Sequence, residues 1–465
     1  MNWTSKRNNM KNKLYICVAA LLLSAPGCDV LEVEPVSDIL SANFYKNADD
    51  AEAALMNVYD YMQQPVKDNI IVIPGAMADE FRVTRGGNFT RHENFAPTPV
   101  QGNVGDMWRA LYFGIQAAND VIENVPNISD PALDADQVLG EAYFLRGMAF
   151  FYLTRLYGKI PLPTTASKSP NQDFNLSRSE LPVVYEQIIG DLLQAEERLS
   201  ATSTNRARAS KGAARALLAK VYLFRNEPGD YQLALTETEE VMADNQYSLV
   251  PGENYASLFK VGEQNTAETI FEISYRPNRS VESHSIENET VPFIGNSPRV
   301  LPEQKLIDLF NENPQDLRLP ISLGEYNDIV YTRKYELNED LTVSDRGSQT
   351  NNVIILRLAD VILMRAEALN ELERTSEAIE YLNMIRARAG LDPTTATSQA
   401  EVRLAIENER YLELAFEGHR WFDLVRTGRA MDLVPQLTSP DRVLWPVPAR
   451  DIDLNPNLLP QNPSY

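Results

Sequence analysis

Residues 363–385 read LMRAEALNELERTSEAIEYLNMI, and this stretch decides the fold class. Its apolar residues recur every three or four positions, which is the period of a packed helix and not the alternation of a strand. Ala366 and Ala378 each stand shortly before a leucine, and such small residues let two antiparallel helices approach closely. The pattern therefore predicts a hairpin of two helices over 353–371 and 375–389.

A second stretch repeats this arrangement. Residues 213–242 read AARALLAKVYLFRNEPGDYQLALTETEEVM, and they bring Ala219 and Ala234 together around a turn at 228–231. Helix pairs of this kind are typical of tetratricopeptide-like repeats, which stack into an α-α superhelical scaffold. Alanine-rich hairpins also occur in plain helical bundles, so the periodicity leaves that arrangement open. In both cases the fold class is mainly α.

The same period predicts further helices on either side of the two hairpins. Ser-x-x-Glu at 398–401 and Asp-x-x-Glu at 49–52 have the pattern of capping boxes, and Pro182 stands where the first turn of a helix tolerates proline. The helices expected from period and boundary signals, beyond 353–371 and 375–389, are 49–64, 105–125, 134–157, 182–199, 210–225, 230–244, 302–311 and 399–427.

Two long stretches between these helices have a different character. Residues 65–104 and 272–350 are rich in Pro, Gly, Asn and isolated aromatic residues, with short β-like runs such as 269–275 and 329–335. They predict an irregular, loop-rich face that carries short β-hairpins. Loops of this length in a compact protein usually have a function, so we expect the ligand there.

The N-terminal segment has the layout of a secretory signal. From Met10 the chain reads MKNKLYICVAALLLSAPGC, with two lysines before an uncharged run from Leu14 to Ala25. This run is shorter than the roughly 20 apolar residues that span a bilayer. We therefore expect residues 1–27 to be a signal peptide that is removed, with translation starting at Met10.

The positions of the two cysteines indicate how the mature chain could be attached to a membrane. Cys17 lies inside the expected signal, so the mature chain has Cys28 alone and no disulfide. A cysteine directly after Ala-Pro-Gly resembles the acylated N-terminus of a bacterial lipoprotein, although Ala25 stands where such motifs usually have leucine. Several acyl chains on Cys28 would anchor the protein firmly to a membrane. The alternative is an ordinary signal followed by a stray cysteine.

Charge and motif content exclude several classes of function. The chain has 65 Asp and Glu against 43 Lys and Arg, a net charge of −22, which repels nucleic acid and anionic headgroups. The three histidines are scattered singly, so we expect neither a metal site nor a cofactor. No phosphate-binding loop or nucleophile elbow occurs. Glycoside hydrolysis needs only two carboxylates and stays open, although pairs such as Asp79-Glu80 are common by chance in an acidic chain.

A charged cluster at helical spacing predicts ion pairs along one face: Glu409, Arg410, Glu413, Glu417 and Arg420.

The irregular stretches contain the groups that sugar recognition needs. Aromatic rings pack on the C–H faces of sugars, and planar polar groups bind their hydroxyls. Trp108, Trp421 and Trp445 fall in scaffold motifs and leave no tryptophan as a sugar platform. The alternative is that the aromatics pin the loops to the scaffold while the arginines offset the acidic surface. Local positive charge also suits an anionic ligand, such as a uronic-acid glycan or a peptide terminus. The candidate ligand contacts are Phe81, Arg82, Arg85, Asn88, Phe89, Arg91, His92 and Phe95 in the first stretch and Tyr275, Arg276, Arg279 and Phe293 in the second, which also contains Arg299.

Short sequence blocks follow one another in order along nearly the whole mature chain. They are CDVLEVEP (28–35), NFY (43–45), DDAEAAL (49–55), WxxLYxxIxxAN (108–119), GEAYFLRG (140–147), LYGKIPL (156–162), LRLAD (356–360), RAEA (365–368), NxIRxRAG (383–390), ER (409–410), FEGHRWFDLVR (416–426), LWPVP (444–448) and NPNxxxQNPSY (455–465). Together these blocks resemble the SusD/RagB family of outer-membrane nutrient-uptake lipoproteins. Departures are small: Asp360 stands where that family often has Glu, and Ser464 where it often has Gly.

The resemblance implies a surface-exposed lipoprotein, held to the outer membrane through Cys28, that binds an oligosaccharide or another small nutrient. It implies delivery of this ligand to a TonB-dependent SusC-like β-barrel transporter, without catalysis. It also implies a helical N-terminal region at 28–250 with the ligand loop 65–104, and a C-terminal region at 251–465 with irregular 272–350 and helical 353–427, in one globular unit. A surface glycan-degrading hydrolase and a ligand-free helical-repeat scaffold protein are the alternatives.

Overall fold

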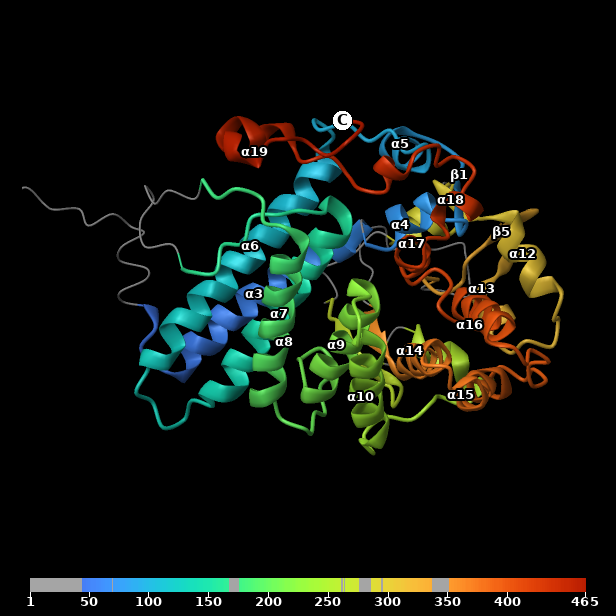
Figure 1. Cartoon of the computed structure of the whole chain (residues 1–465), viewed down its shortest axis with the longest axis horizontal. Coiled ribbons are helices and arrows are strands. Elements are labelled where there is room, and N and C mark those ends of the chain that lie inside the picture. Colours follow the sequence, from blue (N-terminus) through green and yellow to red (C-terminus); the bar gives the residue numbers. More distant parts are fainter. Residues whose placement is uncertain are drawn as a thin grey trace, which may run out of the picture. The chain divides into compact units, whose positions relative to one another are not determined.

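Long helices follow one another through most of the chain, as the apolar period predicts (Figure 1). The structure is a computed structural model that describes residues 44–68, 70–166, 175–260, 262, 264–275, 286–293, 296–336 and 351–465. Residues 45–465 form one unit by their contacts. The predicted signal peptide and Cys28 lie outside the described residues.

The scaffold is a series of helices in which each packs on the next, so that the apolar face of one is covered by its neighbour. The series runs from α3 to α6, α7, α8, α9, α10 and α14, and α14 packs on both α15 and α16. The bounds are α3 Ala48–Asp68, α6 Gly102–Asn124, α7 Ala135–Tyr157, α8 Leu181–Arg198, α9 Lys211–Arg225, α10 Asp230–Ala243, α14 Leu358–Glu371, α15 Thr375–Arg388 and α16 Gln399–Glu413.

Both predicted hairpins are confirmed. α9 packs on α10 and α14 packs on α15, and the alanines expected at the contacts are fully buried: Ala219 and Ala234 in the first pair, Ala366 and Ala378 in the second. The mainly α, tetratricopeptide-like scaffold predicted from these stretches is therefore the observed fold. Trp108, Trp421 and Trp445 are buried, as their scaffold motifs indicate.

The prediction of a helix over 353–371 is wrong for its first five residues. Val353–Arg357 form strand β6, which pairs antiparallel with β2 (Thr269–Ile273), and α14 begins only at Leu358. All five residues of β6 are buried. A short strand that is buried on both faces has the same continuous apolar pattern as a buried helix, so the period does not distinguish them.

The prediction of one helix over 399–427 is also wrong. α16 ends at Glu413, and the chain turns before α17 (Arg420–Arg426) begins. Phe416 and Gly418 have φ of 66° and 78°, which a right-handed helix does not allow. A Cβ on Gly418 would lie 2.5 Å from the carbonyl oxygen of Ile70, so only glycine fits this close approach.

The expected helix starts are confirmed in two cases and shifted in one. Ser398 and Glu401 form the predicted capping box at the start of α16, and Pro182 lies in the first turn of α8. α3 instead begins before the predicted box at 49–52, because the Asn47 side chain accepts the hydrogen bond from the backbone N–H of Asp50 at 3.0 Å.

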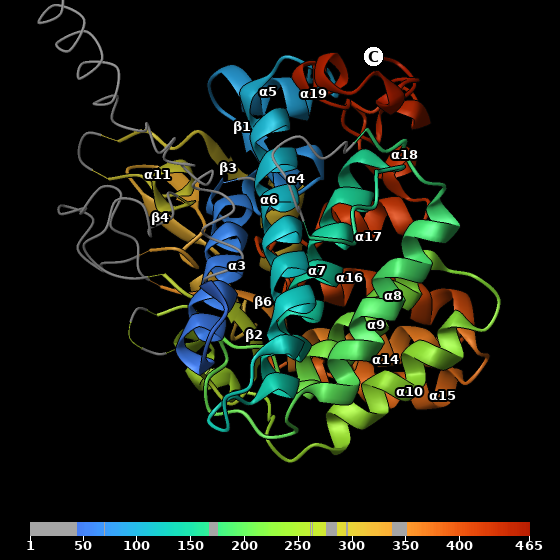
Figure 2. The same ribbon diagram turned by 90° about the vertical axis from the view of Figure 1, so that its left-hand side faces the viewer.

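The irregular stretches lie beside this scaffold, and they contain two of the three small strand pairs in the described part of the chain. Only β4 (Gly324–Tyr326) and β5 (Ile329–Tyr331) form a hairpin, whose turn residues Asn327 and Asp328 both have positive φ. Strand β1 (Phe81–Val83) pairs with the distant β3 (Val300–Pro302). Figure 2 shows β1, β3, β4 and α11 to the left of α6, with β1 uppermost.

Short helices complete the described part of the chain. They are α4 Val72–Met77, α5 Gly87–Glu93, α11 Ile286–Thr290, α12 Gln304–Asn311, α13 Leu319–Ser322, α18 Ala430–Leu433 and α19 Ala449–Leu454, with 3-10 turns at Val125–Asn127, Gly252–Leu258, Pro440–Arg442 and Pro456–Leu458.

Candidate functional site

The two irregular stretches meet at one hollow with a volume of about 550 Å³. The antiparallel pairing of β1 with β3 continues beyond the strands, where the backbone N–H of Thr84 donates to the carbonyl oxygen of Arg299 at 2.8 Å. This pairing brings the segment 85–89 close to Arg299, which lies about two hundred positions later in the chain. The hollow is lined by Ile73, Arg85, Gly86, Gly87, Asn88, Phe89, Asn103, Glu289 and Arg299.

Two glycines shape the wall that comes from the first stretch. Gly86 and Gly87 have φ of 82° and 58°, a region that L side chains rarely adopt, and they lie where the chain passes from β1 into α5, which begins at Gly87. Asn88 and Phe89 follow these glycines directly and line the hollow. Phe89 is mostly buried, and its ring forms part of the wall.

Two arginines supply the positive charge of the hollow. Nη1 of Arg299 lies 3.1 Å from Oε1 of Glu289, and the guanidinium lies 5.9 Å from the ring centroid of Phe89. Nη2 of Arg85 donates to the carbonyl oxygen of Ser297. A guanidinium has five N–H donors, so each arginine keeps donors that bind no other described residue. The Arg299 side chain is 51% exposed, which leaves these donors open to a ligand.

The side chain of Asn103 contributes an amide group to the hollow. Oδ1 of Asn103 accepts from Gln101 at 2.8 Å, and its Nδ2 lies 2.8 Å from Nε2 of His92. The His92 ring is buried against Trp445, with 4.4 Å between the ring centroids. Burial lowers the pKa of His92 to about 3, so the ring is neutral near pH 7 and accepts from Asn103. The hydrogen bond with His92 therefore orients the amide of Asn103, while the His92 side chain does not line the hollow.

Of the twelve contacts predicted from the sequence, the structure brings Arg85, Asn88 and Phe89 together on the hollow. Arg82 and Arg91 are exposed but do not line it, and Arg276 and Arg279 lie outside the described residues. The other five are buried, which agrees with the alternative that loop aromatics pin the loops to the scaffold. These five are Phe81 on Phe416, Phe95 on Trp421, His92 on Trp445, Tyr275, whose hydroxyl donates to Gln63, and Phe293.

Six lining residues were not among the twelve predicted contacts, although Arg299 was noted as part of the second stretch: Ile73, Gly86, Gly87, Asn103, Glu289 and Arg299. Asn103 and Ile73 lie within the expected loop 65–104, but nothing in their local pattern sets them apart from other polar and apolar loop residues. Glu289 lies in the second stretch, where only aromatic and basic or amide residues were selected. Its position became evident only from the ion pair with Arg299.

The adjacent carboxylates Asp79 and Glu80 have structural environments. Asp79 accepts two hydrogen bonds from Arg420, at 2.7 and 3.0 Å, and one from Lys305 at 2.6 Å. Burial opposes ionisation, but these partners lower the pKa of Asp79 below its ordinary value. Burial raises the pKa of Glu80 to about 8, although the backbone N–H of Phe416 donates to it. Both side chains are buried and neither lines the hollow.

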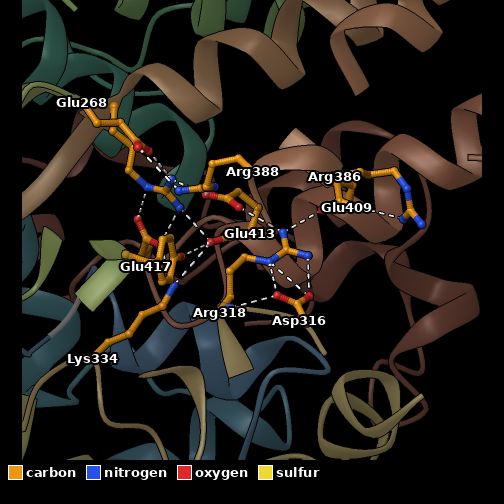
Figure 3. Close-up of polar contacts among 11 residues, drawn as sticks. Glu268, Asp316, Arg318, Lys334, Arg386, Arg388, Glu409, Glu413 and Glu417 are labelled. Atoms are coloured by element: carbon orange, nitrogen blue, oxygen red, sulfur yellow. Dashed lines mark hydrogen bonds and ion pairs between the residues drawn. The ribbon is translucent and has the colours of Figure 1, made fainter. Parts of the chain in front are cut away.

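The prediction that Glu409, Arg410, Glu413, Glu417 and Arg420 pair along one helix face is wrong, because α16 ends at Glu413 and each of the five pairs with residues of other segments. Glu413 instead lies near the centre of a larger buried network (Figure 3). Glu413 pairs with Arg318, Arg357 and Arg388, and these three cations hold its pKa well below its ordinary range although burial opposes this. Beyond α16, Glu417 pairs with Lys334 and Arg357. The network has five cations and five anions: Arg318, Lys334, Arg357, Arg386 and Arg388 with Glu268, Asp316, Glu409, Glu413 and Glu417. The positive and negative charges of this network are equal in number, and its ion pairs connect segments from Glu268 to Glu417. We therefore interpret the network as structural.

A second cavity, of about 390 Å³, lies on the helical scaffold between α10, α14, α16 and α17. Its charged side chains are already paired. Arg403 binds Glu371 through two hydrogen bonds of 2.6 and 2.7 Å, and Arg426 binds Glu367 and Asp423. The four carboxylates that line this cavity, Glu367, Glu371, Glu407 and Asp423, are paired with its arginines, whereas the hollow has Glu289 alone beside two arginines.

Within the described ranges, no group of three or more His, Cys, Asp or Glu side chains could hold a metal ion. Over the same part of the chain, no helix is long and apolar enough to cross a membrane.

Comparison with known proteins gives concordant matches over most of the chain. A family model described as "SusD family" matches residues 320–438, and one described as "Starch-binding associating with outer membrane" matches residues 29–223. SusD-like protein P2 of Formosa agariphila is 29% identical, with 97% of this chain and all of the relative covered.

Solved structures agree with this result. A SusD homologue from Bacteroides thetaiotaomicron superposes with a TM-score of 0.81 at 25% identity, covering 92% of this chain and 99% of the other. A laminarin-binding SusD-like protein superposes with a TM-score of 0.79 at 27% identity, covering 90% and 100%. Sequence blocks, family models and the helical fold therefore all lead to one conclusion: the chain belongs to the SusD/RagB family.

Proposed function

We propose that the protein is a cell-surface lipoprotein that captures an oligosaccharide in the hollow and delivers it to a TonB-dependent SusC-like β-barrel transporter of the outer membrane. Family membership supports this role, because one matching family model is described as starch-binding and associated with the outer membrane. The laminarin-binding relative supports a glycan as the ligand.

The observation that carries the proposal is the composition of the hollow. One aromatic ring, two asparagine amides and two arginines with open donors line a single hollow of about 550 Å³: Phe89, Asn88, Asn103, Arg85 and Arg299. A sugar ring presents a C–H face that packs on an aromatic ring, and hydroxyls around its edge that bind planar polar groups. The volume lies within the range of small-molecule sites and accommodates a short oligosaccharide.

Attachment to the membrane is assigned to Cys28. This residue follows the predicted signal and is the single cysteine left once the signal is removed. Acyl chains on this residue would place the protein at the outer membrane, where a transporter could take over the ligand.

The protein is proposed to bind its ligand without cleaving it. Hydrolysis of a glycosidic bond generally requires two carboxyl groups that flank the bond. Among the described residues that line the hollow, Glu289 is the one carboxylate, and Arg299 neutralises it. The pair Asp79 and Glu80 is buried outside the hollow. These placements favour binding over the hydrolase alternative, and the hollow itself favours binding over a ligand-free scaffold.

Isothermal titration calorimetry with the full-length protein in detergent tests this proposal. We expect at least one oligosaccharide of a broad panel to bind, and Asn88→Ala, at an exposed lining residue, to weaken its binding with little change in melting temperature. Thin-layer chromatography of the same mixtures should show no shortened products. Product formation that a single carboxylate substitution abolishes would establish the hydrolase instead. Purification from native outer membranes should recover a β-barrel transporter together with the protein.

A further inference from the structure

We infer that the hollow selects an anionic glycan, in which a carboxylate or sulfate group of the sugar binds Arg85 and Arg299 while a sugar ring packs on Phe89. This inference rests on the proposed function and adds the class of substrate. It depends on the charge of the hollow and on the hydrogen-bond donors that its arginines leave open.

The charge of the hollow opposes that of the whole chain. The chain has a net charge of −22, yet the charged side chains that line the hollow are two arginines and one glutamate. Arg82 and Arg91 add exposed positive charge on the same segment. Asp79 is paired with Arg420 and Lys305, whereas Glu93, whose Oε1 accepts from the backbone N–H of Val83 at 2.7 Å, keeps its negative charge and offsets one of these exposed arginines. The hollow is therefore a site of local positive charge on an acidic protein.

Both arginines have N–H groups that a ligand could bind, and these groups favour an anionic acceptor. Arg85 uses Nη2 on the carbonyl oxygen of Ser297, and Arg299 uses Nη1 on Glu289. The remaining N–H groups of each guanidinium bind no other described residue. Hydrogen bonds from a guanidinium to an oxyanion are stronger than those to a neutral hydroxyl, and they can be bidentate. A carboxylate or sulfate group therefore gains more from these donors than a hydroxyl does.

The position of Arg299 over Phe89 links charge recognition to ring recognition. Its guanidinium lies 5.9 Å from the centroid of the Phe89 ring, so an anion bound by Arg299 lies close to the aromatic wall. A uronic acid or a sulfated sugar carries its anionic group on the edge of a ring that has an apolar face. One sugar residue can therefore contact both Phe89 and Arg299.

The test compares glycans that differ only in charge. Calorimetry with the full-length protein in detergent would use oligomers of galacturonate, guluronate and glucuronate, each beside its methyl ester, and sulfated galactan oligomers beside their desulfated forms. The carboxylate and sulfate pairs distinguish the two sources of the anion. We expect an acidic form to bind at least about tenfold more tightly than its neutral partner, with an advantage that shrinks as salt is added.

Substitutions assign the effect to the two arginines. Arg85→Gln and Arg299→Gln should each weaken binding of the acidic form by about tenfold and leave any binding of its neutral partner nearly unchanged. Arg374→Gln is the matched control, because it removes the same charge from a half-exposed residue on the helical scaffold and should not affect either ligand. Unchanged melting temperatures would show that all three variants fold.

Each of the other outcomes has a definite meaning. If neutral glycans bind as tightly as acidic ones, or if the arginine variants retain the preference for acidic glycans, the inference is overturned while the proposed function stands. If no glycan in the panel binds, the proposed function fails and the inference fails with it.

Discussion

The carboxylate of Glu80 accepts a hydrogen bond of 2.7 Å from the backbone N–H of Phe416, a residue 336 positions later in the chain. This contact secures the turn between α16 and α17, where Phe416 has a positive φ, against the segment that leads into the hollow. The second carboxylate oxygen of Glu80, Oε2, is buried and has no hydrogen-bond partner in the described part of the structure. Burial therefore raises the pKa of Glu80 to about 8.

Stability should decrease with rising pH because of Glu80. Between pH 4.5 and about 8 the folded protein keeps a proton on this side chain that the unfolded chain has released, so stability is lost as pH rises towards 8. Burial also raises the pKa of Glu237, to about 7, so the interval from pH 7 to 8 is the most informative. We expect Glu80→Gln to remove a slope of up to ~1.4 kcal/mol per pH unit in urea unfolding over this interval. The exposed Glu380→Gln should leave the slope unchanged, and an unaltered slope in Glu80→Gln would contradict the assignment.

Removing Glu413 should strongly destabilise the protein. Glu413→Ala leaves Arg357, Arg388 and Arg318 buried with one fewer anion, and such uncompensated charge typically costs about 3–5 kcal/mol. Chemical denaturation at pH 7 measures the loss. Glu377→Ala, which removes an exposed partner of Arg374, should change stability little. Similar effects of the two substitutions would show that the buried network is not required for stability.

Two glycines with positive φ should respond differently to alanine. At Gly418 a Cβ would lie 2.5 Å from the backbone oxygen of Ile70, whereas at Gly87 it would meet no atom within 4 Å. Gly87→Ala should therefore cost only the conformational penalty, ~1–2 kcal/mol, and Gly418→Ala should cost more because backbone must also move. Thermal denaturation of both variants tests this order. A smaller loss for Gly418→Ala would refute the close approach.

Cys28→Ala should release the protein from membranes. The reason is that acyl chains on this cysteine are the proposed anchor, and no described helix could replace them. Fractionation with a carbonate wash, followed by immunoblotting, measures the shift from the pellet to the soluble fraction. Cys17→Ala, within the predicted signal peptide, should keep the protein in the pellet. Continued pelleting of Cys28→Ala would argue against lipidation as the anchor.

Much of the scaffold could be predicted from the sequence, because amphipathic helices reveal themselves locally. The hairpins at α9–α10 and α14–α15 followed from the apolar period and from alanines at the contacts. Strand β6 could not be recognised, since a strand that is buried on both faces is as continuously apolar as a buried helix. The break at Phe416 escaped detection because a non-glycine residue with positive φ leaves no local signal.

The candidate site could be predicted only in part, for a different physical reason. Composition indicated the correct stretches and three residues of the hollow, Arg85, Asn88 and Phe89. It could not separate aromatics that line the hollow from those, such as Phe81 and Phe95, that fill the core. It could not show that Glu289 would oppose Arg299, because that contact depends on how residues 215 positions apart, Thr84 and Arg299, pair with each other.

The pairing of β1 with β3 has a consequence for how the protein matures. Each strand has only three residues, and neither wall of the hollow exists as a binding surface until both have met. Contacts so distant in sequence form slowly, because a long loop must close before they can stabilise anything. The ability to hold a ligand should therefore arise late in folding, after the intervening helices have docked. Capture of a ligand would then report that folding of the molecule is complete, and a severed half of the chain would have no affinity of its own.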